Sequence, residues 1–451
     1  MKKGFFKRIL ALSITVLTLA SAVSGCGDKG TSKEDMENPS GKLVIGGWPA
    51  GDEAFKSMEA KFKEKYPDVE LEYQFMNTED FRQALNTSLT AGSNAPDVAM
   101  IEGAWIGKLR ESNALENLKE EPYGAEKYKD DFVEFNWNQA YSVDGSRLSA
   151  IPWDIGPCSF FYRKDIFEEV GLPSDPAEVE KLISTWDGLL EVAEKVHIPN
   201  ERWLLPQASY LYQWLFINRD YFNEKLELQL DRPGSIEALN AAITMRENGW
   251  DAQTSDMWTN EANAGFANGS IVAVATGAWY GGFLKSWVSP DNAGKWGITK
   301  MPAGIDDCNW GGSFLAIPSQ SKNKAAAWAF VEFMLANSEA QNTMFEAVDY
   351  FPAYKPAWED TAIYDAEDPY FDGQKSKALW VEIAENIKPV YTTMMDSTCE
   401  GNILNAVNTG LNEGKSAEEI IAYVEEFITN ETAEDRAANI DVLKDAGLWK
   451  E

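Results

Sequence analysis

The sequence predicts an α/β protein whose mostly parallel sheets are flanked by helices. Short β-branched runs alternate with amphipathic stretches of helical spacing along most of the chain. In the first hundred residues the order is strand, helix, strand, helix, strand, which demands right-handed crossovers. With 451 residues, of which 44% are apolar, the chain has the length of about two to three globular domains.

The first five elements have clear local signals. Residues 42–46 form a short β-branched run, and apolar residues recur at helical spacing over 53–66 until Pro67 ends the helix. Residues 69–75 alternate with period two, as in a half-buried strand. A helix follows over 81–91, stopped by Gly92, and 97–101 is the third strand.

The rest of the chain continues the alternation. Thr185 is a plausible helix cap, and Pro233 and Gly234 precede another helix. We expect strands at 147–151, 159–162, 271–275, 297–301 and 314–317, and helices at 164–170, 186–196, 235–249 and 324–336. The C-terminal third is rich in helix, with segments at 378–387, 403–410 and 417–429.

The N-terminus has the pattern of a bacterial lipoprotein signal. Four basic residues precede an apolar stretch over 9–23, and small residues lead into Cys26. Cleavage of 1–25 would leave the Cys26 thiol available for acylation, and two or more chains such as palmitate would anchor the protein stably. The polar residues 26–41 are expected to form a flexible tether. We therefore expect an extracellular protein on the outer face of the cytoplasmic membrane.

The charge and the scarcity of histidine exclude several classes of function. Seventy-two acidic against 40 basic residues give a formal charge of −32, which argues against a nucleic-acid binder. One histidine, His197, excludes multi-His metal sites and argues against a Ser-His-Asp enzyme. We expect no cofactor and no metal. Cys158, Cys308 and Cys399 are expected to be buried; one disulfide is possible, and the sequence leaves the pair open.

The order of several short motifs resembles a known family. The motifs are KLVI at 42–45, FKEKYP at 62–67, AGSNAPDV at 91–98, LSAIP at 148–152, FYRKD at 161–165, TWD at 185–187, FANG at 266–269, GAW at 277–279 and GGSFLAI at 311–317. Together they resemble the family 1 extracellular solute-binding proteins of ABC importers, the sugar-binding group that includes maltose-binding proteins. The resemblance runs from about residue 42 to about residue 427.

The resemblance implies a two-lobe periplasmic-binding-protein-like fold of type II with a ligand cleft between the lobes. The N-terminal lobe would take 42–155 and 295–350, and the C-terminal lobe would take 156–294 and 351–451. Such a protein is a monomer and not an enzyme. It captures a carbohydrate by hinge closure and delivers it to the permease and ATPase subunits of an ABC transporter by docking on the permease.

A sugar ring presents C–H faces that pack on aromatic plates and hydroxyls that need carboxylates or amides. Trp48 follows the first strand, Trp153 and Asp154 lie at the first crossover, and Trp310 and Gly311 precede a strand. By resemblance, the loop with Glu102 and Trp105 faces the cleft, as does the stretch with Tyr210 and Trp214. The family also places an aromatic plate at the position of Trp279, beside Tyr280. We expect the nearby glycines, Gly277, Gly281 and Gly282, to leave the Trp279 indole uncovered.

Two other functions stay open at this stage. A surface glycoside hydrolase would also need aromatic plates, together with two carboxylates about 5–10 Å apart. A solute-binding protein for a non-sugar ligand is the second alternative. Because the expected cleft residues are aromatic and acidic, a polyamine or another cation is the first non-sugar ligand to consider.

Overall fold

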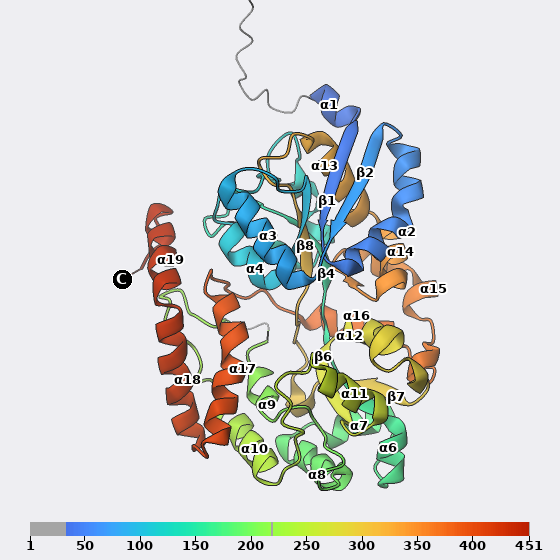
Figure 1. Cartoon of the computed structure of the whole chain (residues 1–451), viewed down its shortest axis with the longest axis vertical. Coiled ribbons are helices and arrows are strands. Elements are labelled where there is room, and N and C mark those ends of the chain that lie inside the picture. The colour runs from blue at the N-terminus through green and yellow to red at the C-terminus, as the bar shows by residue number, and fades with distance from the viewer. Residues whose placement is uncertain (1–32, 218–219, 451) are drawn as a thin grey trace, which may run out of the picture.

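The computed structural model describes residues 33–217 and 220–450, and their strands form two sheets (Figure 1). The predicted signal peptide and Cys26 lie outside the described residues. The first sheet has the order β2-β1-β3-β8-β4-β9 and the second has the order β6-β5-β7. The strands are β1 (Gly41–Gly47), β2 (Val69–Phe75), β3 (Val98–Glu102), β4 (Ile151–Ile155), β5 (Cys158–Arg163), β6 (Ala273–Gly277), β7 (Trp296–Thr299), β8 (Ser313–Ala316) and β9 (Phe351–Pro352).

The first sheet begins as the sequence predicts. β1 pairs in parallel with β2 and with β3, and the intervening helices supply the crossovers. Leu43 and Ile45 of β1 are fully buried. The helices that accompany the first sheet are α1 (Lys33–Glu37), α2 (Pro49–Lys65), α3 (Thr78–Ala91), α4 (Gly103–Leu109), α5 (Glu134–Gln139), α13 (Lys324–Leu335) and α14 (Ser338–Val348).

Elsewhere the expectation of mostly parallel sheets is wrong. β8 pairs antiparallel with β3 and β4, β9 pairs antiparallel with β4, and both pairings of β5 in the second sheet are antiparallel. β4, β8 and β9 lie next to places where the chain passes between the sheets. They therefore join the first sheet without the βαβ crossover that imposes a parallel direction.

Helices also surround the second sheet and form the C-terminal part of the chain. They are α6 (Lys164–Glu169), α7 (Pro176–Leu182), α8 (Trp186–Val196), α9 (Tyr210–Gln213), α10 (Ser235–Glu247), α11 (Asn260–Asn268), α12 (Tyr280–Phe283), α15 (Thr361–Tyr364), α16 (Ser376–Asn386), α17 (Asp396–Asn412), α18 (Ala417–Glu431) and α19 (Ala433–Asp445). α17 packs against α4 of the upper half in Figure 1 and against α9 and α10 of the lower half.

We call the first sheet with its helices the first lobe and the second sheet with its helices the second lobe. The chain passes from the first sheet to the second between β4 and β5, and it returns between β7 and β8. β7 pairs with β5, so residues 296–299 belong to the second sheet, whereas the sequence expectation assigned them to the N-terminal lobe. The full residue ranges expected for the lobes stay a prediction.

Part of the expected tether is folded. α1 occupies residues 33–37, and the side chain of Met36 packs against the hydrophobic core. α1 also contacts α13. A single apolar residue in a polar stretch thus anchors this segment to the first lobe, and β1 begins four residues after α1 ends.

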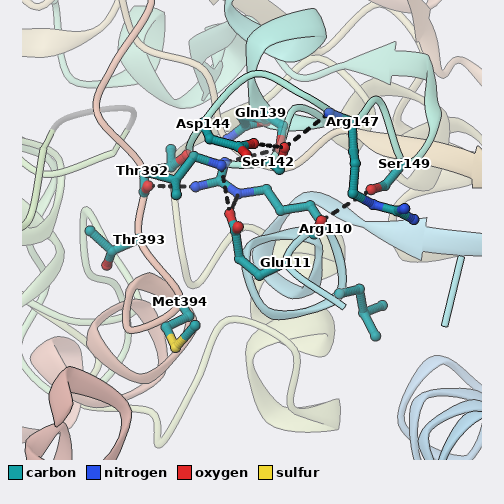
Figure 2. A network of polar contacts seen from close by, with 12 residues as sticks. Arg110, Glu111, Gln139, Ser142, Asp144, Arg147, Ser149, Thr392, Thr393 and Met394 are labelled. Atoms are coloured by element: carbon teal, nitrogen blue, oxygen red, sulfur yellow. Dashed lines mark hydrogen bonds and ion pairs between the residues drawn. The ribbon is translucent and has the colours of Figure 1, made fainter. Parts of the chain in front are cut away.

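The segment between α16 and α17 is attached to the first lobe by Arg110 (Figure 2). Arg110 is buried, with 5% of its surface exposed. Its guanidinium donates to the Thr392 hydroxyl and carbonyl, both at 2.7 Å, to the Gln139 carbonyl at 3.1 Å and to Glu111 at 3.1 Å. The chain therefore touches the first lobe again before α17 begins.

A continuous hydrophobic core runs through both lobes. Among residues 33–217 and 220–450, no helix is long and apolar enough to cross a membrane.

Candidate functional site

A cavity of about 480 Å³ lies between the two lobes. Its size is in the range of small-molecule sites in proteins. The lining residues come from the ends of strands of both sheets and from neighbouring helices. They are Trp48, Thr78, Glu102, Asp154, Trp258, Trp279, Phe283, Trp310, Gly311, Gly312, Ser313, Tyr350 and Glu400.

One wall of the cavity is an aromatic surface from the second lobe. The rings of Trp258 and Trp279 stack with centroids 5.5 Å apart and planes 24° apart. Phe283 of α12 packs at 5.7 Å from Trp279, and Trp287 continues the row at 5.6 Å from Phe283. Trp258 and Trp287 are 45% and 52% exposed. Trp258 lines the cavity and Trp287 continues the aromatic row beyond the lining residues. Exposed rings of this size suit a ligand with an apolar face.

The indole of Trp279 is held in place from behind. Its Nε1 donates a hydrogen bond of 2.8 Å to the carbonyl of Trp310. A Cβ on Gly156 would lie 1.9 Å from that carbonyl, and a Cβ on Gly277 would lie 2.4 Å from Trp279 Nε1. Gly156 and Gly277 therefore make room for the indole itself.

This role differs from the one that we expected for the neighbouring glycines. A Cβ on Gly281 would meet the ring of Trp380, and one on Gly282 would meet Asp349 and the backbone of Val348. Both glycines thus allow close packing of α12 inside the protein. The expectation that they keep the indole uncovered is wrong.

The first lobe contributes Trp48 and Tyr350 to the cavity. Trp48 directly follows β1 and precedes α2, so it lies at the carboxyl end of a parallel strand, where open α/β sheets bind ligands. Trp105 of α4 packs edge-on against Trp48, with centroids 6.0 Å apart, and thus supports this ring. Burial raises the pKa of Tyr350, whose phenol therefore stays protonated.

Three carboxyl groups line the cavity: Glu102 at the end of β3, Asp154 in β4 and Glu400 in α17. The hydroxyl of Ser313 donates to Asp154, and the indole Nε1 of Trp310 donates to Glu400 at 3.1 Å. The three acids come from three separate elements, so the fold gathers them from distant parts of the chain.

Burial changes the protonation of these acids. Burial, together with the like charges of the nearby Glu400 and Asp154, raises the pKa of Glu102 to about 7. Burial also raises the pKa of Asp154 to about 7 and moves that of Glu400 upward. No lysine or arginine is among the described residues that line the cavity. The surface thus offers oxygen atoms that accept, or when protonated donate, hydrogen bonds to a neutral or cationic ligand.

A smaller, more enclosed cavity adjoins this one and shares Glu102, Trp310, Gly311 and Glu400 with it. Gln139, Gln213, Thr393 and Asp396 are among the polar residues in its lining. The side-chain oxygens of Gln139 and Gln213 are buried without a hydrogen-bond partner. The polar surface available to a ligand therefore extends beyond the aromatic wall.

The structure brings six of the residues expected from the sequence to the main cavity. They are Trp48, Glu102, Asp154, Trp279, Trp310 and Gly311. The binding role of these residues stays a prediction.

The other five expected residues do not line the cavity. Trp105 supports Trp48. Trp153, Tyr210, Trp214 and Tyr280 are buried in the core, each at most 4% exposed. Trp153 lies where the pairing of β4 with β8 is irregular, and it packs in the core against Phe55 at 5.0 Å, while the next residue, Asp154, lines the cavity.

The remaining buried aromatics are covered by helix packing. Trp214 stacks on Trp186 at 6.3 Å, and Tyr280 packs against Phe161 and Phe266 at 5.9 Å. Tyr210 lies 6.3 Å from the ring of Trp310. It accepts a hydrogen bond from the Met257 amide and donates one to Asp256, so it supports the cavity wall from behind.

Several lining residues are not among the site residues expected from the sequence, although Tyr350 lies near the expected return crossover: Thr78, Trp258, Phe283, Gly312, Ser313, Tyr350 and Glu400. Glu400 is the fifth residue of α17, on a helix where an acid is usually solvated, and Trp258 lies in the loop between α10 and α11. Neither position has a local signal. A surplus of tryptophan near Trp279 and Trp287 in the sequence is the one cue that could have drawn attention to Trp258.

Comparison with known proteins supports this architecture. The chain is 23% identical over 404 residues to an arabinooligosaccharide-binding protein of Bacillus subtilis, covering 85% of this chain and 90% of that protein. It is 27% identical over 362 residues to a maltotriose-binding protein of Pyrococcus abyssi, covering 76% and 73% of the two chains.

A solved structure has the same fold. The ABC transporter associated binding protein from B. animalis subsp. lactis, in complex with β-1,6-galactobiose, matches with a TM-score of 0.69 and 23% identity. The match covers 91% of this chain and all of that one. The predicted two-lobe α/β fold is therefore confirmed.

A family profile described as bacterial extracellular solute-binding protein matches residues 57–368, more than two thirds of the chain. The chain therefore belongs to the bacterial extracellular solute-binding proteins.

Proposed function

We propose that this protein captures a carbohydrate, an oligosaccharide of at least two rings, in the cavity between its lobes and delivers it to an ABC importer without changing it chemically. The observation that carries the proposal is the pairing of a stacked Trp258 and Trp279 wall with three carboxyl groups in one cavity. Aromatic plates suit the C–H faces of sugar rings, and carboxyls suit their hydroxyls. Relatives named for arabinooligosaccharide and maltotriose binding support the same ligand class.

The extent of the site supports a ligand of more than one sugar ring. The aromatic wall extends from Trp258 over Phe283 to the exposed Trp287, and the polar cavity adjoins the other side. A single sugar ring covers only one part of this surface. A chain of rings would contact both the aromatic wall and the carboxyl groups.

We further propose that Cys26 is acylated and holds the protein on the outer face of the cytoplasmic membrane, where it docks on the permease as a monomer. The basic and apolar residues before Cys26 support this proposal. Capture at the membrane surface keeps the loaded protein close to its transporter.

A thermal-shift screen against neutral oligosaccharides tests the function. A ligand that binds only the folded state raises the melting temperature by an amount set by its concentration and affinity. We expect at least one di- to tetrasaccharide to raise it by several degrees at millimolar concentration. No shift with any sugar in a broad panel would contradict the proposal.

A second candidate ligand is a cation such as a polyamine. The observation that favours it is the set of three cavity carboxyls without a lysine or arginine in the described lining. Spermidine and putrescine therefore belong in the same screen, and a shift with them alone would replace the sugar proposal. The hydrolase alternative is tested by incubating the bound oligosaccharide with the protein, because a binding protein returns it intact.

A further inference from the structure

Two buried cysteines lie against each other where the chain passes between the lobes. Cys158 is the first residue of β5, and Cys308 lies in the segment between β7 and β8. Their sulfur atoms are 2.7 Å apart, closer than the roughly 3.5–4.0 Å at which non-bonded heavy atoms attract one another. Each residue is 1% exposed. Nothing else fits between the two sulfurs.

The surrounding backbone fixes this arrangement. The amide of Cys158 donates to the carbonyl of Cys308 at 2.9 Å, and the next residues pair as an antiparallel bridge between Pro157 and Asn309. The amide of Trp310 donates to the carbonyl of Gly156 at 2.8 Å, and the amide of Gly156 donates to the Asn309 side chain at 2.8 Å. The two crossing strands are thus held in register at the position of the cysteines.

We propose that Cys158 and Cys308 form a disulfide that joins the two strands crossing between the lobes. The protein belongs to an extracellular family, and disulfides persist in oxidising compartments outside the cytoplasm. The two sulfur atoms face each other, as a disulfide requires.

The chemistry is a two-electron oxidation by an external disulfide. One cysteine thiolate attacks that disulfide and forms a mixed disulfide, which releases one thiol. The second cysteine thiolate then attacks the protein sulfur of the mixed disulfide and releases the second thiol. The two cysteines lose two protons and two electrons, and the external disulfide is reduced to two thiols. Because both cysteines are buried in the fold, the exchange takes place before folding is complete.

The third cysteine of the described chain provides an internal contrast. Cys399 lies in α17 and is fully buried. Burial and the nearby Asp396 raise the pKa of its thiol. A thiol held in the protonated form is a poor nucleophile, so we expect Cys399 to take no part in thiol exchange once the fold has formed.

The cross-link would constrain the cavity as well as the chain. The two cysteines are 150 positions apart. The loop that the bond would close begins with β5 and contains all three strands of the second sheet. Asn309 and Trp310 come directly after Cys308 in the chain. The carbonyl of Trp310 accepts the hydrogen bond from the Trp279 indole. A disulfide here would keep the base of the aromatic wall in one position relative to both lobes.

Peptide mass spectrometry of the secreted full-length protein tests the proposal directly. The protein is denatured in acid, alkylated without reductant and digested. We expect the peptide with Cys158 to be recovered linked to the peptide with Cys308, and Cys399 to be alkylated. Recovery of both peptides in the alkylated form would overturn the proposal, as would a linkage of either cysteine to Cys399.

A second measurement reports what the bond does. Protein that is reduced in denaturant and refolded with reductant should melt about 2–5 °C lower than the oxidised protein, as expected for a disulfide that closes a long loop in a chain of this length. The double variant Cys158→Ala, Cys308→Ala should melt at the same temperature with and without this treatment, whereas Cys399→Ser should keep the full difference. Equal melting temperatures for reduced and oxidised wild-type protein would contradict the proposal.

Discussion

At the scale of single residues, Trp279 contacts two other tryptophans that line the cavity. Its indole stacks on Trp258 and donates a hydrogen bond to Trp310. We expect Trp279→Ala to weaken binding of the cognate sugar by about 2–4 kcal/mol, a factor of about 30 to about 1000 in the dissociation constant. Calorimetric titration of the wild type and the variant measures this difference.

Trp214→Ala is the matched control, because this tryptophan is buried and stacks on Trp186 away from the cavity. Its loss should lower the free energy of unfolding by about 3–5 kcal/mol and leave sugar affinity within about threefold. If Trp279→Ala keeps its affinity and loses as much stability as the control, Trp279 is a packing residue and not a ligand plate.

Glu102 should make stability depend on pH. Its pKa is raised to about 7, above the value of about 4.3 in an unfolded chain. Its contribution to stability is therefore complete below about pH 4 and is lost as the pH rises through about 7. Glutamine is neutral at both pH values, as protonated Glu102 is. The free energy of unfolding of Glu102→Gln should therefore be about 1–3 kcal/mol higher than that of the wild type at pH 8 and equal to it near pH 4.5. Urea unfolding at both pH values measures this, and a constant difference between the two proteins would refute it.

Some residues expected from the sequence lie at the cavity, and their positions there have a local cause. Trp48, Glu102 and Asp154 reach the cavity because each lies at the end of a strand or within a crossing strand. Trp153 shows the limit of the signal, since it packs in the core while the next residue, Asp154, lines the cavity, and the sequence does not say which of the two faces the ligand. Glu400 comes to the cavity only through the packing of α17, which no local pattern reveals.

At the scale of elements, α4 packs closely on the segment that precedes α17. A Cβ on Gly107 would lie 2.7 Å from the carbonyl oxygen of Thr393. Gly107→Ala should therefore lower the free energy of unfolding by about 1–3 kcal/mol, although alanine favours a helix. Gly401 in α17 is the control, because a Cβ there meets nothing within 4 Å. Gly401→Ala should stabilise the protein by about 0.5–1 kcal/mol.

Chemical denaturation of both variants gives these values. A stabilising effect of Gly107→Ala would show that α4 and the Thr393 backbone can separate without cost. That result would also contradict a close attachment of this segment to the first lobe.

Helices and strands with a regular pattern were predictable, and strand direction was not. The predicted helices at 186–196 and 417–429 match α8 and α18 closely, because their apolar spacing is local. The direction of β8 and β9 depends on where the chain re-enters the first sheet after the second lobe. That information lies in contacts between residues more than a hundred positions apart, such as Ile151 with Leu315.

At the scale of the whole molecule, Cys26 should decide where the protein resides. We expect Cys26→Ala to release the protein from the membrane fraction into the medium, because no helix among the described residues could replace the anchor. Fractionation of cells that express the wild type and the variant measures this. A variant that remains in the membrane fraction after a salt wash would contradict lipid anchoring.

The arrangement of the two lobes leads to one central claim: the cavity between them holds an oligosaccharide against Trp258 and Trp279 and within reach of Glu102, Asp154 and Glu400. A crystal structure of the protein with the sugar that gives the largest thermal shift is the most direct test. The account predicts a sugar ring stacked on the Trp258 and Trp279 surface, with hydroxyls within about 3 Å of at least one of the three carboxyl groups. Electron density for the sugar outside this cavity, with the cavity itself filled only by water, would contradict the claim.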